Sequence, residues 1–124
     1  MVSAFFSRVI RPLAHAFEPQ LVLVSAGYDS AVGDPLGGLV LSSGAFRWMS
    51  GSLAHICTRS GAAGPVCFLE GGYDTGLLAA GIEATIEGLN AGPGHMDGQP
   101  TAPETALIDV LVRRLSPYWV SALA

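Results

Sequence analysis

Two short apolar runs, each followed at once by a glycine-containing loop, constrain most strongly what this chain can fold into. The first, Gln20 to Ala26 (QLVLVSA), begins after Pro19 and ends at Gly27. The second, Pro65 to Leu69 (PVCFL), runs directly into Glu70. Short continuous apolar runs are typical of strands that are buried on both faces of a parallel sheet. We therefore predict two parallel strands that are adjacent or nearly so.

Helical patterns alternate with these two runs. Apolar residues recur at helical spacing from Val2 to Phe17, although Pro12 weakens the middle of that segment. Further helices are predicted from Ser42 or Ser43 to about 58, over 75–89 and over 101–115, with a loop at 91–103 before the last one. This alternation implies an α/β fold in which right-handed crossovers place helices on both faces of a parallel sheet.

Composition disfavours several classes of protein. Half of the 124 residues are hydrophobic and 13% are charged, which predicts a folded chain. The six basic residues, all Arg, face ten acidic ones for a net charge of −4, which disfavours nucleic-acid binding, and the absence of Lys excludes a P-loop. Two Cys without a CxxC motif, and no apolar run near about 18 residues, predict an intracellular protein, cytoplasmic or nuclear, with no membrane span.

The loop after the first run carries one candidate functional residue, Asp29. Ligands of open α/β sheets bind at the carboxyl ends of the strands, and Asp29 follows the run 20–26 closely. A carboxylate at a rigid strand end can be a metal ligand. The alternative is that Asp29 and Asp34 are turn residues whose side chains accept hydrogen bonds from nearby backbone N–H groups. Spacing alone leaves both interpretations open.

The segment Gly71-Gly72-Tyr73 after the second run is the other candidate. Two glycines permit positive φ or a close backbone approach. A phenol at the rim of the crevice can donate a hydrogen bond to a developing oxyanion. The alternative is a Tyr that closes an ordinary Gly-rich turn. Glu70 receives no catalytic role, because a strand end points such a side chain away from its neighbours as often as toward them.

Together the segments SAGYDSAVGDPLGG and LEGGYD resemble the class II histone deacetylases and their bacterial acetylpolyamine amidohydrolase relatives. The resemblance runs from about Phe17 through Leu89, with both motifs in the family's order and spacing. It implies a partial domain of the three-layer arginase/deacetylase-like fold. It also implies that residues 1–124 form the carboxy-terminal part of a single catalytic domain.

The same resemblance implies roles for individual residues. Asp29 matches the family's third protein ligand of a catalytic Zn²⁺, and Tyr73 matches the Tyr that polarises the scissile amide carbonyl. Leu36 stands where polyamine-selective members carry Glu, so the chain is more similar to the branch that acts on acetylated lysine in histones or other proteins. The resemblance places these residues in or beside the substrate channel: Gly27, Tyr28, Leu36, Gly71 and Gly72.

The sequence lacks the family's other zinc ligands and its general base. The family takes these from an Asp-x-His motif and a His-His pair, and His15, His55 and His95 match neither motif. We interpret the three as a helix-surface residue, a last-turn residue and a loop residue. The resemblance therefore implies a zinc-dependent deacetylase whose zinc site is incomplete in this chain, which by itself is expected to be inactive.

Two alternatives stay open beside this interpretation. One is an inactive truncated paralogue that acts as a binding or interaction module, and the other is an acetylpolyamine amidohydrolase. The expected partner is a protein that carries acetylated lysine, with no direct contact to nucleic acid or membrane. An unpaired strand edge and exposed apolar surface also predict that the chain associates with itself.

Overall fold

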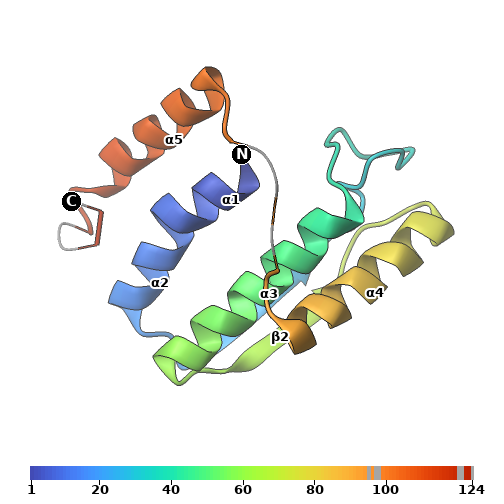
Figure 1. Cartoon of the computed structure of the whole chain (residues 1–124), viewed down its shortest axis with the longest axis horizontal. Helices are drawn as coiled ribbons and strands as arrows, with labels where there is room; N and C mark the ends of the chain where they lie inside the picture. Colours follow the sequence, from blue (N-terminus) through green and yellow to red (C-terminus); the bar gives the residue numbers. More distant parts are fainter. Residues whose placement is uncertain (95, 97–98, 120–121, 124) are drawn as a thin grey trace.

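The structure of this chain is a computed structural model that describes residues 1–94, 96, 99–119 and 122–123. Figure 1 shows α3 and α4 side by side in front of two strands, α1 and α2 beside α3, and α5 outermost. In chain order the elements are α1 (Val2–Phe5), the π-helix η1 (Phe6–Ile10), α2 (Arg11–Phe17), β1 (Leu21–Ala26), α3 (Ser43–Ser60), β2 (Ala63–Leu69), α4 (Thr75–Ala91) and α5 (Ala102–Leu115).

The first helical segment passes Pro12 without a break. Proline has no N–H to donate to the preceding turn of a helix. Pro12 stands in the first turn of α2, which directly follows a π turn. Within it the Arg11 N–H donates to the carbonyl of Phe6, five residues earlier. The helix ends where Glu18 adopts a left-handed conformation with φ of 51°. The weak point expected at Pro12 is therefore a widened turn.

The two strands are parallel neighbours, as predicted. Their register pairs Val24 with Cys67 and Ala26 with Leu69. Strand β2 begins at Ala63, two residues before the predicted start, because the Ala63 N–H donates to the carbonyl of Gln20 at 2.9 Å. Both strands therefore end at the same edge, where the loops that carry the candidate residues begin.

Helices α3 and α4 cover one face of the sheet and build the core. The core cluster comprises Tyr28, Ala31, Phe46 and Ala84, and it packs against Ala26 at the end of β1. The two helices approach closely because Gly88 leaves room for the other backbone. A Cβ atom at Gly88 would collide with the carbonyl oxygen of Arg47.

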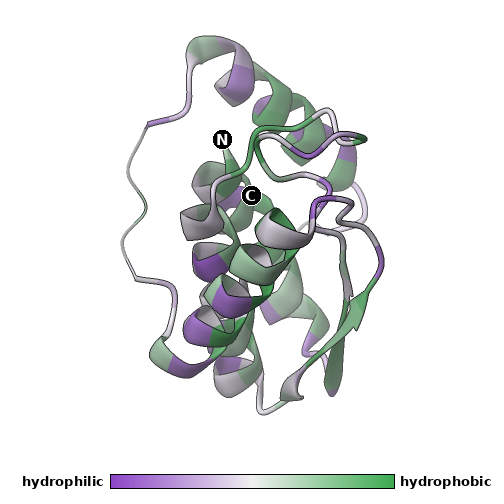
Figure 2. Ribbon diagram, turned by 90° about the vertical axis from the view of Figure 1, so that its right-hand side faces the viewer, coloured by the Kyte–Doolittle hydropathy of each residue, from purple (hydrophilic) through white to green (hydrophobic). Residues whose placement is uncertain are grey.

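The opposite face of the sheet is uncovered in the described part of the chain. Leu23 is 60% exposed and Phe68 is 56% exposed, although both lie within strands. Figure 2 shows the strands on the outside of the molecule with the helices on one side of them. The prediction that these strands are buried on both faces is therefore wrong for the chain by itself, because a continuous apolar run shows what a strand can bury and not what covers it.

Capping residues set the ends of the two long helices. The Ser42 hydroxyl accepts a hydrogen bond from the Ala45 N–H at 3.3 Å, and Gly61 ends α3 with φ of 70°. At the start of α4, the Asp74 carboxylate accepts from the Leu77 N–H at 2.8 Å. Such caps satisfy backbone groups that have no partner within the helix. The predicted start and end of α3 are confirmed to within two residues.

The last helix, α5, lies against η1. Val9 of η1 and Ile108 of α5 are each 2% exposed. The Arg8 guanidinium forms an ion pair with the Asp109 carboxylate at 2.7 Å. The predicted loop 91–103 contains His95 and other residues that lie outside the described ones, while α4 extends to Ala91 and α5 starts at Ala102. Within the described residues, no helix is both long and apolar enough to cross a membrane.

Candidate active site

The loops after β1 and β2 are held side by side by backbone hydrogen bonds. The Glu70 N–H donates to the carbonyl of Ala26 at 3.1 Å, and the Tyr28 N–H donates to the carbonyl of Gly71 at 2.8 Å. The parallel pairing thus continues two residues past the strand ends. This continuation brings the segment that holds Asp29 next to the segment that holds Tyr73.

The Asp29 carboxylate lies against the backbone of Gly71. A Cβ atom at Gly71 would stand 2.6 Å from Oδ2 of Asp29, and one at Gly27 would stand 3.0 Å from Oδ1. Only glycine fits at Gly71 without displacing this carboxylate. In the described part of the chain no hydrogen bond or ion pair engages the Asp29 side chain, so its oxygens keep their lone pairs available.

Asp34, five residues further along the same loop, is fully engaged. Its Oδ1 accepts from the N–H groups of Leu36 at 2.9 Å and Gly37 at 3.1 Å, which is the turn predicted for this residue. Its Oδ2 accepts from the Tyr73 N–H at 2.8 Å, across the site. Burial by itself would raise the pKa of Asp34, but these N–H donors outweigh it, so the pKa of the carboxyl lies below its ordinary value.

The bond from Asp34 to Tyr73 was not expected from the sequence. The order Asp-Pro-Leu-Gly predicts a turn closed by the aspartate, and nothing in it specifies an acceptor for a residue 39 positions away. Asp34 is therefore a positioning residue: it fixes the main chain of one loop relative to the other.

Tyr73 itself combines a fixed backbone with a free side chain. Its N–H is held by Asp34, and the next residue, Asp74, caps α4. The residue before it, Gly72, has φ of 133°, a conformation that disfavours any side chain. The Tyr73 side chain is nevertheless 57% exposed. A phenol on such a rigid stem can be presented to a bound molecule at little conformational cost.

Tyr28 does not lie in a channel in this structure. Its ring is 5% exposed and packs against Phe46, with the ring centroids 5.2 Å apart. Its hydroxyl donates to Thr85 Oγ1 at 3.0 Å, and Gly81 of α4 makes room for the ring. We therefore leave Tyr28 out of the proposed channel, because its side chain belongs to the core on the covered face.

The other predicted channel residues lie in the same two loops. Gly71 is buried beside the Asp29 carboxylate, and Gly27 lies in the same loop as Asp29, where a Cβ atom would stand 3.0 Å from that carboxylate. Leu36 is 71% exposed, on the turn that Asp34 closes. Their part in a channel remains a prediction.

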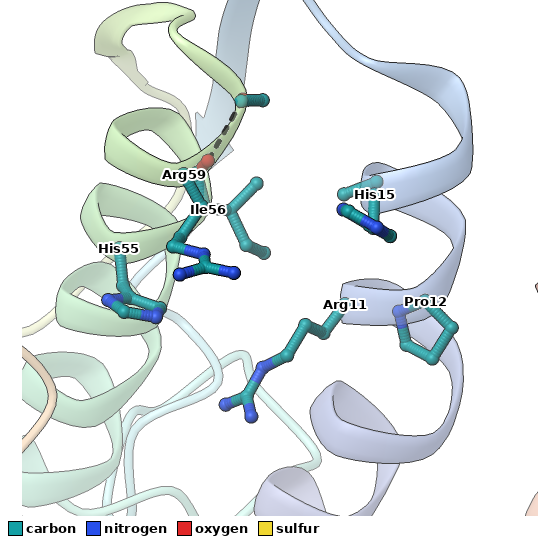
Figure 3. A pocket seen from close by; sticks show the side chains of 8 residues that line it. Arg11, Pro12, His15, His55, Ile56 and Arg59 are labelled. Carbon is teal, nitrogen blue, oxygen red and sulfur yellow. Dashed lines mark hydrogen bonds between the residues drawn. The ribbon is translucent and has the colours of Figure 1, made fainter.

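The described residues do not supply a complete zinc site. Among them, no group of three His, Cys, Asp and Glu side chains could hold a metal ion. Zinc sites take about three or four protein ligands, and the described residues at this edge of the sheet do not bring that many together. His15 and His55 lie elsewhere, on α2 and α3 (Figure 3), and His95 lies outside the described residues.

Comparison with known proteins identifies the family. The family described as "Histone deacetylase domain" matches residues 1–89. The chain belongs to the histone deacetylase family. Members of this family are hydrolases. That the chain belongs to the family confirms the resemblance drawn from the two motifs.

Two curated relatives match almost the whole chain. The human protein named Polyamine deacetylase HDAC10 is 38% identical over 122 residues, which is 95% of this chain and 18% of that protein. The human protein named Histone deacetylase 7 is 36% identical over 124 residues, which is 94% of this chain and 13% of that protein. The chain therefore spans less than a fifth of either relative.

Two solved histone deacetylase structures share the fold. The histone deacetylase Clr3 superposes with a TM-score of 0.84 at 30% identity, over 99% of this chain and 20% of that one. The HDA15 HD domain superposes with a TM-score of 0.82 at 28% identity, over 94% of this chain and 32% of that one. The predicted fold class, an arginase/deacetylase-like α/β fold of which this chain carries a part, is confirmed.

Proposed function

We propose that this chain supplies part of the active site of a zinc-dependent deacetylase that hydrolyses the amide of N-acetyl-lysine in histones or other proteins. Asp29 is the proposed metal ligand and Tyr73 the proposed hydrogen-bond donor to the substrate. The observation that carries the proposal is the pairing of an unengaged Asp29 carboxylate with a rigidly held Tyr73 at one sheet edge.

The division of labour follows from these two side chains. A bound Zn²⁺ would supply Lewis-acid polarisation of the amide carbonyl. The Tyr73 phenol would donate a hydrogen bond to that carbonyl oxygen, and this bond strengthens as negative charge develops there. Asp34 accepts a hydrogen bond from the Tyr73 main-chain N–H at 2.8 Å and thereby fixes the point on the backbone from which the phenol would reach the substrate. A general base that takes a proton from the attacking water would have to come from residues other than those described.

The chain by itself is expected to bind Zn²⁺ weakly and to turn over no substrate, because one carboxylate cannot supply the coordination of a three-ligand site. Calorimetric titration of the chain with Zn²⁺ tests this. Stoichiometric submicromolar binding would show that the ligand assignment is wrong.

We place the protein inside the cell, in cytoplasm or nucleus.

A chimaera tests the proposed roles directly. Residues 20–89 of this chain would replace the matching segment of Clr3, and deacetylation of an acetyl-lysine peptide would be measured. Tyr73→Phe should lower kcat by about a hundredfold to a thousandfold, the usual cost of losing one oxyanion donor. Asp29→Asn should also abolish activity and lower the zinc content. Glu83→Gln in the same chimaera, on the exposed side of α4, serves as the matched control and should leave activity unchanged.

A second candidate substrate is an acetylated polyamine, because three curated relatives are named polyamine deacetylases. Leu36 decides between the two substrates under our proposal, since an apolar side chain cannot pair with a cationic amine. Leu36→Glu in the same chimaera should shift kcat/KM toward acetylated polyamines. A parent chimaera that already prefers acetylated polyamines would move the proposal to that class.

We also propose that the chain associates with itself through the uncovered sheet face. Leu23, Val66 and Phe68 form an apolar strip on that face, exposed by 60%, 43% and 56%. Exposed apolar patches of this kind favour association. Size-exclusion chromatography should give oligomers for the parent chain and a monomer for Phe68→Arg. A monodisperse parent chain with little dye uptake would instead favour an independently folding binding module.

A further inference from the structure

A cavity that is separate from the candidate active site lies between α2 and α3. Its volume is about 430 Å³. Helix α3 starts at the candidate active site and ends at Ser60, and a helix of 18 residues spans roughly 27 Å, so the cavity near its last turns is remote from Asp29. The cavity is lined by Arg11, Pro12, Ala14, His15, His55, Ile56, Arg59 and Ser60.

The lining is basic and arranged in two matching pairs. Arg11 and His15 stand four residues apart on α2, and His55 and Arg59 stand four residues apart on α3. Residues at this spacing lie on the same face of a helix. In Figure 3 the Arg11 side chain extends from α2 toward α3, and the His55 and Arg59 side chains project from α3. His15 lines the same cavity from α2. Two cationic faces thus meet across one cavity.

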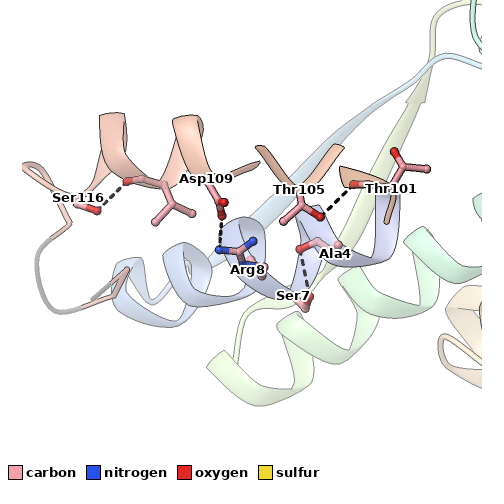
Figure 4. A network of polar contacts seen from close by, with 8 residues as sticks. Ala4, Ser7, Arg8, Thr101, Thr105, Asp109 and Ser116 are labelled. Atoms are coloured by element: carbon pink, nitrogen blue, oxygen red, sulfur yellow. Dashed lines mark hydrogen bonds and ion pairs between the residues drawn. The ribbon is translucent and has the colours of Figure 1, made fainter. Parts of the chain in front are cut away.

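No carboxylate balances these cations. The lining includes no Asp or Glu. Elsewhere in the described chain two of the other four Arg side chains have ion-pair partners: Arg8 bonds Asp109 at 2.7 Å (Figure 4), and Arg47 lies 3.7 Å from Glu87. Neither Arg11 nor Arg59 has an ion pair with a described residue. The excess of positive charge is therefore local, because the whole chain carries a net charge of −4.

The ends of the two helices explain only part of this arrangement. The C-terminus of a helix carries about half a negative charge, which favours cations in its last turn. His15 lies in the last turn of α2 and Arg59 in the last turn of α3, whereas Arg11 is the first residue of α2. The two helix ends together offset at most about one positive charge, whereas the two guanidinium groups carry two. A net positive charge remains for a ligand.

We propose that this cavity binds a small molecule that carries a phosphate group. Guanidinium groups donate paired, charge-assisted hydrogen bonds that match phosphate oxygens. The volume lies within the range of about 300–1,000 Å³ typical of ligand sites, and exceeds what an inorganic phosphate fills. Pro12, Ala14 and Ile56 offer an apolar wall for the rest of the molecule. A nucleic acid would need an extended basic surface instead of one cavity.

Calorimetric titration of the 124-residue chain with pyrophosphate at low salt tests the proposal. Binding should weaken about tenfold or more in Arg11→Gln and in Arg59→Gln, since each removes a charge-assisted hydrogen-bond donor. Arg114→Gln, on the exposed end of α5, is the matched control and should bind like the parent chain. Far-ultraviolet circular dichroism would confirm that helix content is equal in all variants.

Broadening of the ³¹P NMR signal of pyrophosphate gives a second readout that does not depend on heat. Absence of binding by both methods would overturn the proposal. Equal weakening in Arg114→Gln, or none in the two cavity variants, would show attraction to general surface charge and overturn it as well. Citrate that binds as tightly as pyrophosphate would overturn the assignment to phosphate.

Discussion

The two faces of the β1–β2 sheet differ in what stabilises them. On the covered face, the Tyr28 hydroxyl donates a hydrogen bond to Thr85 Oγ1 at 3.0 Å, and the Tyr28 ring packs against Phe46. Side chains from the loop after β1, from α3 and from α4 therefore form one packed cluster. On the uncovered face, Phe68 is 56% exposed although it is as apolar as Phe46, which is 7% exposed. The same residue type thus contributes to the core in one place and to the surface in the other.

This difference shows that apolar character alone does not define a core. A buried phenylalanine gains contacts with many neighbouring atoms, and those contacts require a partner element at the right distance. Glycines set that distance on the covered face, where Gly81 admits the Tyr28 ring and Gly88 admits the α3 backbone. The uncovered face has no such partner among the described residues.

Replacement of the two phenylalanines should give the largest contrast between the faces. Phe46→Ala should lower the free energy of unfolding by about 3–5 kcal/mol, because it leaves a cavity beside Tyr28. Phe68→Ala should lower it by less than about 1 kcal/mol, the usual range for exposed strand positions. Urea unfolding followed by circular dichroism measures both. Similar losses in the two variants would mean that the uncovered face is packed in solution.

Substitution of a contact glycine should have a smaller effect on the covered face. Gly88→Ala places a methyl group against the Arg47 carbonyl and the Ser50 hydroxyl and should destabilise the chain by about 1–3 kcal/mol. Gly44→Ala is the matched control, since its Cβ would find nothing closer than Ser42 Oγ at 3.6 Å. That control should be neutral or slightly stabilising, as alanine favours helix. A neutral Gly88→Ala would contradict the close α3–α4 packing.

Lowering the pH should have the smallest effect on the stability of the chain. It acts on the loops at the edge of the sheet and not on either of its faces. The pKa of Asp34 is lowered in the folded chain, so its stabilisation is present above the unfolded pKa of about 3.9 and is lost as pH falls through the lower folded value. Unfolding midpoints should therefore drop below about pH 4. The drop should be reduced in Asp34→Asn and kept in Asp29→Asn; an unchanged drop in Asp34→Asn would remove Asp34 from this role.

The sequence predicts those features of the fold that depend on neighbouring residues. The strands, the cap at Ser42 and the end of α3 at Gly61 follow from local patterns, and the structure contains all three. Parallel pairing follows from the crossover helix, which leaves the second strand few other orientations. Asp29 and Tyr73 could be placed at one edge for the same reason.

The remaining features depend on contacts between distant residues. The bond from Asp34 to Tyr73 joins two loops whose relative position is set by the whole fold. The burial of Tyr28 depends on Gly81 in α4, which follows it by more than fifty positions. Exposed apolar surface follows from the resemblance to part of a domain, but the strand pattern does not specify which face of the sheet is uncovered, because burial is a property of an element and its neighbour together.

The π turn at Phe6–Ile10 sets the direction in which the side chains of α2 point. Such a turn holds one residue more than an α turn, so later side chains stand about 100° back from where a continuous α-helix would carry them. Without it, Ile10 and Ala14 would take the directions that Arg11 and His15 now have. Rewinding the same residues as an unbroken α-helix would thus rotate the basic pair of α2 away from α3 and exchange a cationic cavity wall for an apolar one.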